Sequence, residues 1–130
     1  MYELNKTDIF ATAQYADNAQ DGVVMLLAYE QMTLEQIRNL KIEDVEKVSL
    51  KFKLDPITLK VIRNAIEERG YVDESEIHYF NKSEYVVKGI EEGPVSEEEL
   101  IRRVKKLFSH WDLDELSIED VQQCGLVSKE

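Results

Sequence analysis

The sequence is poor in the residues that build disulfides, rigid turns and membrane spans. Its 130 residues include one cysteine, two prolines and five glycines. The single cysteine, Cys124, excludes a disulfide within the chain and is typical of a reducing compartment. The longest apolar run, residues 23–29, is much shorter than the roughly 20 residues that a membrane-spanning helix needs. The N-terminal residues also lack the basic and apolar regions of a signal peptide. We therefore expect a cytoplasmic protein that does not contact a membrane.

Basic residues are scarce as well: 16 lysines and arginines stand against 27 aspartates and glutamates, a net charge of −11. This balance disfavours non-specific binding to nucleic acid or to an anionic membrane. The excess of acid lies almost entirely in residues 66–130, which hold seventeen acidic and eight basic residues. This half is therefore the candidate surface for a cationic protein partner. The residues that we expect to contact such a partner are Glu91, Glu92, Glu97 and Trp111.

Ligands for metals and nucleophiles for catalysis are equally sparse. The two histidines, His78 and His110, lie far apart in the chain, with no cysteine at the spacing of a zinc site. Cys124 has no histidine at motif spacing. The sequence therefore predicts no metal site and no cofactor.

The length favours one domain, residues 1–130, and the patterning favours a mostly helical α+β fold. Helices are predicted over residues 6–18, from Asp21, from Asp55 to about Arg69, where Gly70 stops the helix, and from Ser117 onward. Capping-box spacing predicts two more, which begin at Thr33 and Ser96. The apolar run 23–29 fits a buried helix or a buried strand equally well.

A small sheet is predicted from alternating apolar and polar residues. Residues 47–53 alternate lysine or serine with Val48, Leu50 and Phe52, which predicts a half-buried strand. Residues 77–80 and 85–87 are two further β-prone pieces around the turn at 81–83. The residues that we expect to share the core are Leu27, Leu40, Ile62 and Val104.

Residues 26–45 resemble the first catalytic box of the tyrosine recombinases, or phage integrases. An apolar helix there leads into a turn with Thr33 and a short helix, and Lys41, Asp44 and Val45 follow. Residues 100–108 resemble the helix before the second box of that family, and residues 115–122 resemble the second box itself. The resemblance covers roughly residues 7–125. It implies a single integrase-like domain with a helical core and a small sheet.

The departures from the family pattern imply that its chemistry is lost. The positions of the catalytic arginine and of its supporting acid fall on Thr33 and Gln36, and those of the second-box histidine and arginine on Glu119 and Gln122. Phosphoryl transfer needs positive charge around the phosphate, and these four residues supply none. Too few residues follow Asp44 for the hairpin that carries the family's lysine, and the sequence ends before the segment of the nucleophilic tyrosine. The resemblance therefore implies a degenerate, truncated relative with no enzymatic activity.

The prediction is thus a non-catalytic accessory or regulatory protein of a phage, prophage or other mobile element in a bacterial host. It is expected to bind a protein partner such as a larger integrase-like regulator. Two alternatives stay open: an acidic mimic of DNA, and a direct DNA-binding regulator that uses the helix with residues 102–106 and the strand with residues 47–53. Residues 116–130 also resemble the start of a helix-turn-helix, but the recognition helix that should follow is absent. The candidate DNA-binding residues are Lys47, Lys51, Lys53, Arg102, Arg103, Lys105 and Lys106.

Overall fold

Seven α-helices, one 3-10 helix and a two-stranded antiparallel sheet form the described part of the computed structural model, residues 3–128. Met1 and Tyr2, the first two residues of the segment compared with a signal peptide, lie outside the described residues. The helices are α1 (Lys6–Gln14), α2 (Ala19–Tyr29), α3 (Leu34–Arg38), η1 (Ile42–Asp44), α4 (Val45–Phe52), α5 (Pro56–Glu67), α6 (Glu97–His110) and α7 (Ile118–Ser128), and the strands are β1 (Gly70–Asp73) and β2 (Glu76–Tyr79). The predicted α+β, mostly helical class is confirmed.

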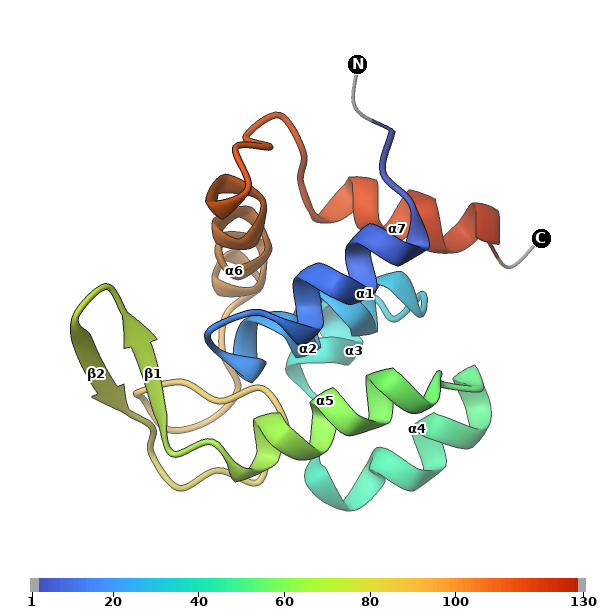
Figure 1. Ribbon diagram of the computed structural model, residues 1–130. Helices are drawn as coiled ribbons and strands as arrows, with labels where there is room; N and C mark the ends of the chain where they lie inside the picture. The colour runs from blue at the N-terminus through green and yellow to red at the C-terminus, as the bar shows by residue number, and fades with distance from the viewer. Residues whose placement is uncertain (1–2, 129–130) are drawn as a thin grey trace.

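Helix α2 is the centre of the molecule. Its residues from Gln20 to Tyr29 are all buried, and it packs against α1, α5, α6 and α7 (Figure 1). The apolar run 23–29 is therefore a helix and not a strand. A helix without a polar face needs neighbours on all sides, and these four helices provide them. The four residues chosen as core markers are all buried: Leu27, Leu40, Ile62 and Val104.

Three predicted helix starts are confirmed by their caps. Thr33 and Gln36 form a complete capping box, with hydrogen bonds of 3.1 and 2.9 Å between each side chain and the other residue's backbone N–H. The Asp55 carboxylate accepts the N–H of Ile57 at 2.8 Å, and Pro56 occupies the first turn of α5. The Ser96 hydroxyl accepts the N–H of Glu99 at 3.1 Å. These contacts join residues at most three positions apart, so the sequence alone predicts them.

The strand predicted at residues 48–52 is wrong, because these residues belong to helix α4. Val45, Val48 and Phe52 are spaced for one helical face, and that face packs against the core. Leu50, which a strand would have turned inward, is 77% exposed. Seven alternating residues fit both the two-residue period of a strand and the 3.6-residue period of a helix, and packing against the neighbouring core favours the helix.

The predicted sheet differs in its pairing. Strand β2 covers most of the expected piece 77–80, but it pairs with β1 and not with residues 85–87. Tyr85 makes only an isolated bridge to Lys41. Gly70 does not stop α5, which ends at Glu67, but begins β1.

The start of α2 also differs from the prediction. Asn18, and not Asp21, occupies the cap position, and Asp21 lies buried in the first helical turn. The Glu68 carboxylate caps the helix from a distant segment by accepting the N–H groups of Ala19 and Gln20 at 2.7 and 2.8 Å. Burial raises the pKa of Glu68, although these two backbone donors oppose the rise.

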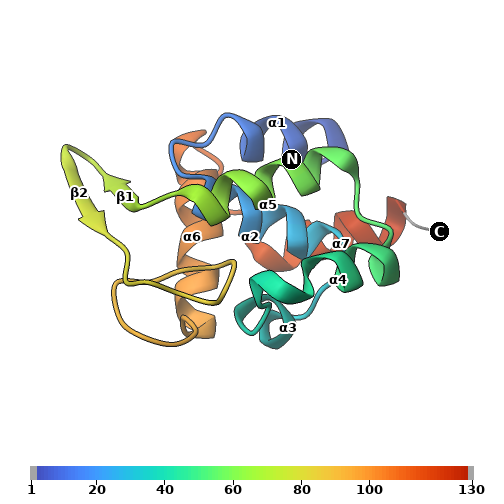
Figure 2. The same ribbon diagram turned by 90° about the horizontal axis from the view of Figure 1, so that it is seen from below.

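The β1–β2 hairpin projects from the helical body beside the loop that leads to α6 (Figure 2). Figures 1 and 2 both place it at the end of the molecule where α5 finishes. No helix among residues 3–128 has the length and apolar character needed to cross a membrane.

Candidate functional site

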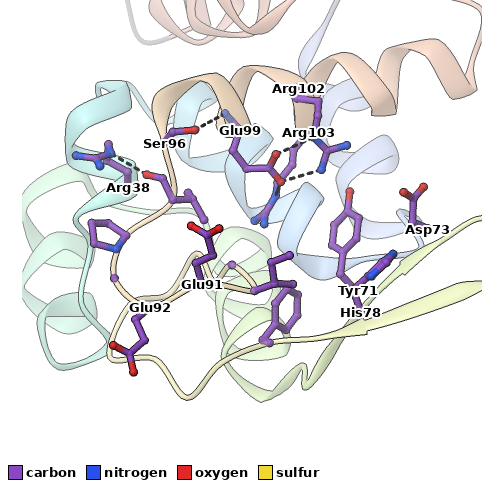
Figure 3. A pocket seen from close by; sticks show the side chains of 16 residues that line it. Arg38, Tyr71, Asp73, His78, Glu91, Glu92, Ser96, Glu99, Arg102 and Arg103 are labelled. Atoms are coloured by element: carbon purple, nitrogen blue, oxygen red, sulfur yellow. Dashed lines mark hydrogen bonds and ion pairs between the residues drawn. The ribbon is translucent and has the colours of Figure 1, made fainter.

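A pocket of about 550 Å³ lies between the hairpin, the loop of residues 89–95 and the first half of α6 (Figure 3). The hairpin wall consists of Tyr71, Asp73 and His78, with Phe80 just beyond β2. The opposite walls contain six charged residues from three elements. These are Glu91 and Glu92 from the loop, Glu99, Arg102 and Arg103 from α6, and Arg38 from the end of α3.

The hairpin wall is held in place by a buried polar network. The Tyr71 hydroxyl donates to the Asp21 carboxylate, with oxygen–oxygen distances of 2.7 and 3.0 Å. The ammonium group of Lys106 donates to the same hydroxyl at 2.9 Å and lies 4.4 Å from the centre of the Tyr71 ring. The Asp21 side chain is only 2% exposed. Burial raises its pKa, and the hydrogen bond from Tyr71 and the charge of Lys106 limit that rise.

The two arginines of α6 share one carboxylate within the molecule. Arg103 is buried; it donates to Glu99 at 2.8 Å and to the Lys88 carbonyl at 2.7 Å. Arg102 forms a two-point contact with the same Glu99 carboxylate at 2.7 Å. Partial burial of Glu99 acts in the opposite direction, but the two guanidinium groups together lower the pKa of Glu99. These contacts direct both guanidinium groups to Glu99, whereas Arg38, the third arginine of the pocket, donates to the Val95 carbonyl at 2.8 Å.

Acidic residues are concentrated in the part of the chain that builds the pocket. Residues 73–99 hold nine acidic residues against two basic ones. Glu99 is half-buried, and the other eight acidic residues are exposed: Asp73, Glu74, Glu76, Glu84, Glu91, Glu92, Glu97 and Glu98. The hairpin, residues 81–95 and the first turn of α6 thus form one acidic end of the molecule. We call this group of eight the acidic end. Three of its carboxylates have ionic partners: Asp73 lies 4.0 Å from Lys106, Glu76 lies 3.5 Å from His78 and Glu84 lies 3.8 Å from Lys41.

The structure gathers three of the four predicted partner-binding residues at this end. Figure 3 shows the Glu91 side chain directed into the pocket and Glu92 directed away from it. Glu97 is exposed in the first turn of α6, next to the cap Ser96 that lines the pocket. Trp111 follows the other end of α6, where it is 57% exposed and lines a separate cavity of about 280 Å³.

The candidate DNA-binding residues fall into two groups that do not meet. Lys47 and Lys51 are exposed on α4, and Lys53 is exposed just after it. The α6 group is largely engaged: Lys105 donates to the carbonyls of Asp114 and Leu116, and Lys106, Arg102 and Arg103 are bound as described above. The predicted basic helix face is therefore not a row of free cations.

The four positions matched to recombinase catalytic residues lie on two segments that approach each other. Thr33 and Gln36 are exposed at the start of α3, and Glu119 and Gln122 are on α7. The Gln31 amide donates to the Gln122 carbonyl at 2.8 Å, which joins the turn before α3 to α7. The hydrogen bond from Ser117 lowers the pKa of Glu119, so this position carries a negative charge at neutral pH.

Sequence reasoning missed the residues that build the pocket wall. Asn18, Asp21 and Tyr71 carry no motif, and the contacts of Asn18 with Val72, of Tyr71 with Asp21 and of Tyr71 with Lys106 join residues 54, 50 and 35 positions apart. The only sequence signal was an aspartate next to an apolar helix, which was interpreted as a cap. No group of three or more histidine, cysteine, aspartate or glutamate side chains within residues 3–128 is placed to hold a metal ion.

No protein-family model matches the chain, and no curated protein sequence matches it.

Proposed function

We propose that this chain is a non-catalytic accessory or regulatory protein of a phage or other mobile element, and that it acts by binding a protein partner with a basic face. The observation that carries the proposal is the acidic end: eight exposed carboxylates lie on the hairpin, on the segment that follows it and at the start of α6, and three of them, Asp73, Glu91 and Glu92, line the pocket. Such a surface attracts a cationic partner and repels competing anions.

The integrase-like origin of the scaffold is part of the same proposal. It is based on the resemblance of residues 26–45 and 100–122, and the contact between Gln31 and Gln122 is consistent with two boxes that share one site. Thr33, Gln36, Glu119 and Gln122 offer no positive charge to a scissile phosphate. We therefore propose that the protein does not cut or join DNA in the host cytoplasm. A covalent protein–DNA adduct formed with a suicide substrate would contradict this.

The test of partner binding compares two triple variants of equal net charge. Glu91→Lys, Glu92→Lys and Glu97→Lys reverse the acidic end, whereas Glu35→Lys, Glu43→Lys and Glu46→Lys reverse exposed acids on α3, η1 and α4. A partner captured from host lysate after nuclease treatment is purified and its association rate with each form is measured at two salt concentrations. We expect the first variant to associate at least tenfold more slowly, and the second to stay close to the wild type.

Equal rates for the two variants would overturn the proposal, because the location of the charge would then not matter. The wild-type rate is expected to fall as salt rises, since exposed charges are screened over about 10 Å at 0.1 M salt.

An acidic mimic of DNA is the second candidate, and the same eight carboxylates favour it. In that case the basic face of the partner is its DNA-binding groove. Duplex DNA added to the purified complex would then displace this protein competitively. Simultaneous binding of DNA and this protein to the partner would reject the mimic and retain partner binding.

A further inference from the structure

Strand β2 has an open outer edge. In an antiparallel pair, hydrogen-bonded residue pairs alternate with pairs whose N–H and C=O groups point outward. Phe80 donates its N–H to the Arg69 carbonyl at 2.9 Å, which marks that pair as hydrogen-bonded. The next pair, Gly70 with Tyr79, and the pair Val72 with Ile77 therefore point outward. Among residues 3–128 no hydrogen bond reaches the outward backbone groups of Ile77 and Tyr79.

The opposite edge of the hairpin is closed by a side chain. The Asn18 amide accepts the Val72 N–H and donates to the Val72 carbonyl, both at 2.7 Å, as a neighbouring strand would. This contact fixes the hairpin on α2 and blocks addition of a strand at β1. Only the β2 edge is thus available, and all four of its residues are exposed.

The two faces of β2 differ in chemistry. Ile77 and Tyr79 are 55% and 73% exposed and lie on the same face as Val72. Glu76 and His78 lie on the other face with Asp73, toward the pocket that contains Glu91. A strand added at this edge would therefore meet Ile77 and Tyr79 on one face, and Glu76 with its neighbour His78 on the face turned toward the pocket carboxylates.

We propose that the partner docks by adding an extended strand, antiparallel, to the β2 edge, and that this strand alternates apolar and basic residues. Its apolar residues lie opposite Ile77 and Tyr79, and its basic residues face Glu76 and the carboxylates at the pocket. Main-chain hydrogen bonds hold the strand, and the alternation selects its sequence. The inference rests on the proposed function, because it names how the acidic end recognises a cationic partner.

The test uses a short peptide of alternating lysine and valine as the probe. Valines opposite Ile77 and Tyr79 would donate their N–H groups to β2, and the lysine N–H groups would face water. Two matched peptides are compared with the parent by titration at low salt: one is N-methylated on the valines and the other on the lysines. We expect valine methylation to weaken binding by roughly tenfold or more, and lysine methylation by less than about twofold.

Amide hydrogen exchange locates the bound peptide independently of variants that disturb folding. We expect the amides of Ile77 and Tyr79 to exchange more slowly when the peptide is bound. Equal binding of the two methylated peptides, or the absence of binding by the parent, would overturn strand addition. Protection of Ile77 and Tyr79 that rises with protein concentration in the absence of peptide would also overturn it, since the edge would then be occupied by a second copy.

The two proposals fail separately. If the reversal of Glu91, Glu92 and Glu97 slows association with the purified partner while both methylated peptides bind equally, partner binding is supported and strand addition is rejected. If that reversal leaves the association rate of the partner unchanged, the acidic end is not the binding surface and both proposals are rejected.

Discussion

Asp21 is a carboxylate almost entirely removed from water, at the point where the hairpin meets α2 and α6. Its charge is stabilised by the Tyr71 hydroxyl at 2.7 Å and by Lys106 at 3.7 Å. A buried charge without such partners is strongly destabilising. The position of the pocket wall therefore depends on individual residues and not on extended packing alone.

Replacing Tyr71 by phenylalanine is expected to lower the free energy of unfolding by about 1–3 kcal/mol at neutral pH, because the Asp21 carboxylate loses a buried donor. Folding raises the pKa of Asp21, so the protonated form of this carboxyl group is the one that the folded state favours. The resulting contribution to stability is present below the ordinary pKa of 3.8 and is lost as pH rises through the folded-state pKa. Tyr71→Phe raises this pKa further. The loss measured by urea unfolding should thus be larger at pH 7 than at acidic pH.

The matched control is Tyr15→Phe, since Tyr15 is 79% exposed. We expect it to change the free energy of unfolding by less than about 0.5 kcal/mol. A Tyr71→Phe loss that is the same at both pH values would show that Asp21 is not the group affected.

Glu99 has the opposite linkage to pH. Its pKa is lowered, so its stabilisation is present above the ordinary value of 4.5 and is lost as pH falls through the folded-state pKa. Glu99→Gln is expected to cost about 1–3 kcal/mol at pH 7, because buried Arg103 loses its charged partner. In urea unfolding the gap between the variant and the wild type should narrow below pH 4.5. Glu98→Gln, at an exposed neighbour, is the control, and a similar loss there would contradict the assignment.

At the scale of elements, close helix contacts set the positions of α1 and α7 on α2. A methyl group on Gly22 would lie 2.4 Å from the Ala13 carbonyl oxygen, and one on Gly125 would lie 1.9 Å from the Tyr29 carbonyl oxygen. Both obstacles are backbone atoms that cannot rotate away. These two glycines allow α2 to be covered on both sides.

Gly125→Ala is expected to destabilise the protein by about 1–3 kcal/mol, because α7 must move away from α2. Helix propensity alone predicts the opposite sign, a gain of about 1 kcal/mol. Gln123→Ala, at an exposed position of the same helix, controls for propensity. The measurement is thermal and urea unfolding followed by circular dichroism. A Gly125→Ala variant at least as stable as the wild type would show that α7 does not pack this closely.

At the scale of the whole molecule, charge is distributed unevenly. The acidic end contains the hairpin, the loop and the start of α6, whereas the exposed lysines of α4 lie on a separate element. The net charge of −11 repels duplex DNA at long range, and the α6 cations are engaged internally.

We therefore expect no measurable affinity for duplex DNA at physiological salt, measured by fluorescence anisotropy of a labelled duplex at two salt concentrations. Tight, salt-sensitive binding that is abolished by Lys47→Ala, Lys51→Ala and Lys53→Ala would favour the direct DNA-binding alternative. The same three substitutions should leave association with the protein partner unchanged.

Local chemistry made several elements predictable from the sequence. The caps at Thr33, Asp55 and Ser96 and the inward residues Leu27, Leu40, Ile62 and Val104 were predicted correctly. Each of these predictions depends on residues within a few positions of one another, or on a segment long enough to show a clear helical period. Residues 48–52 were too few to separate the two periods, and the strand prediction failed there.

The sequence by itself determined the helical class, most helix starts and the acidic character of residues 73–99. Only the tertiary structure decided that α4 is a helix, that β2 pairs with β1, and that Asn18, Asp21 and Tyr71 hold the hairpin beside α6. It also decided that Arg102 and Arg103 turn to Glu99 and that Asp73, Glu91 and Glu92 line one pocket. The physical reason is range: caps and periodicity act between neighbours in the chain, whereas these contacts join segments whose proximity arises only from packing of the complete core around α2.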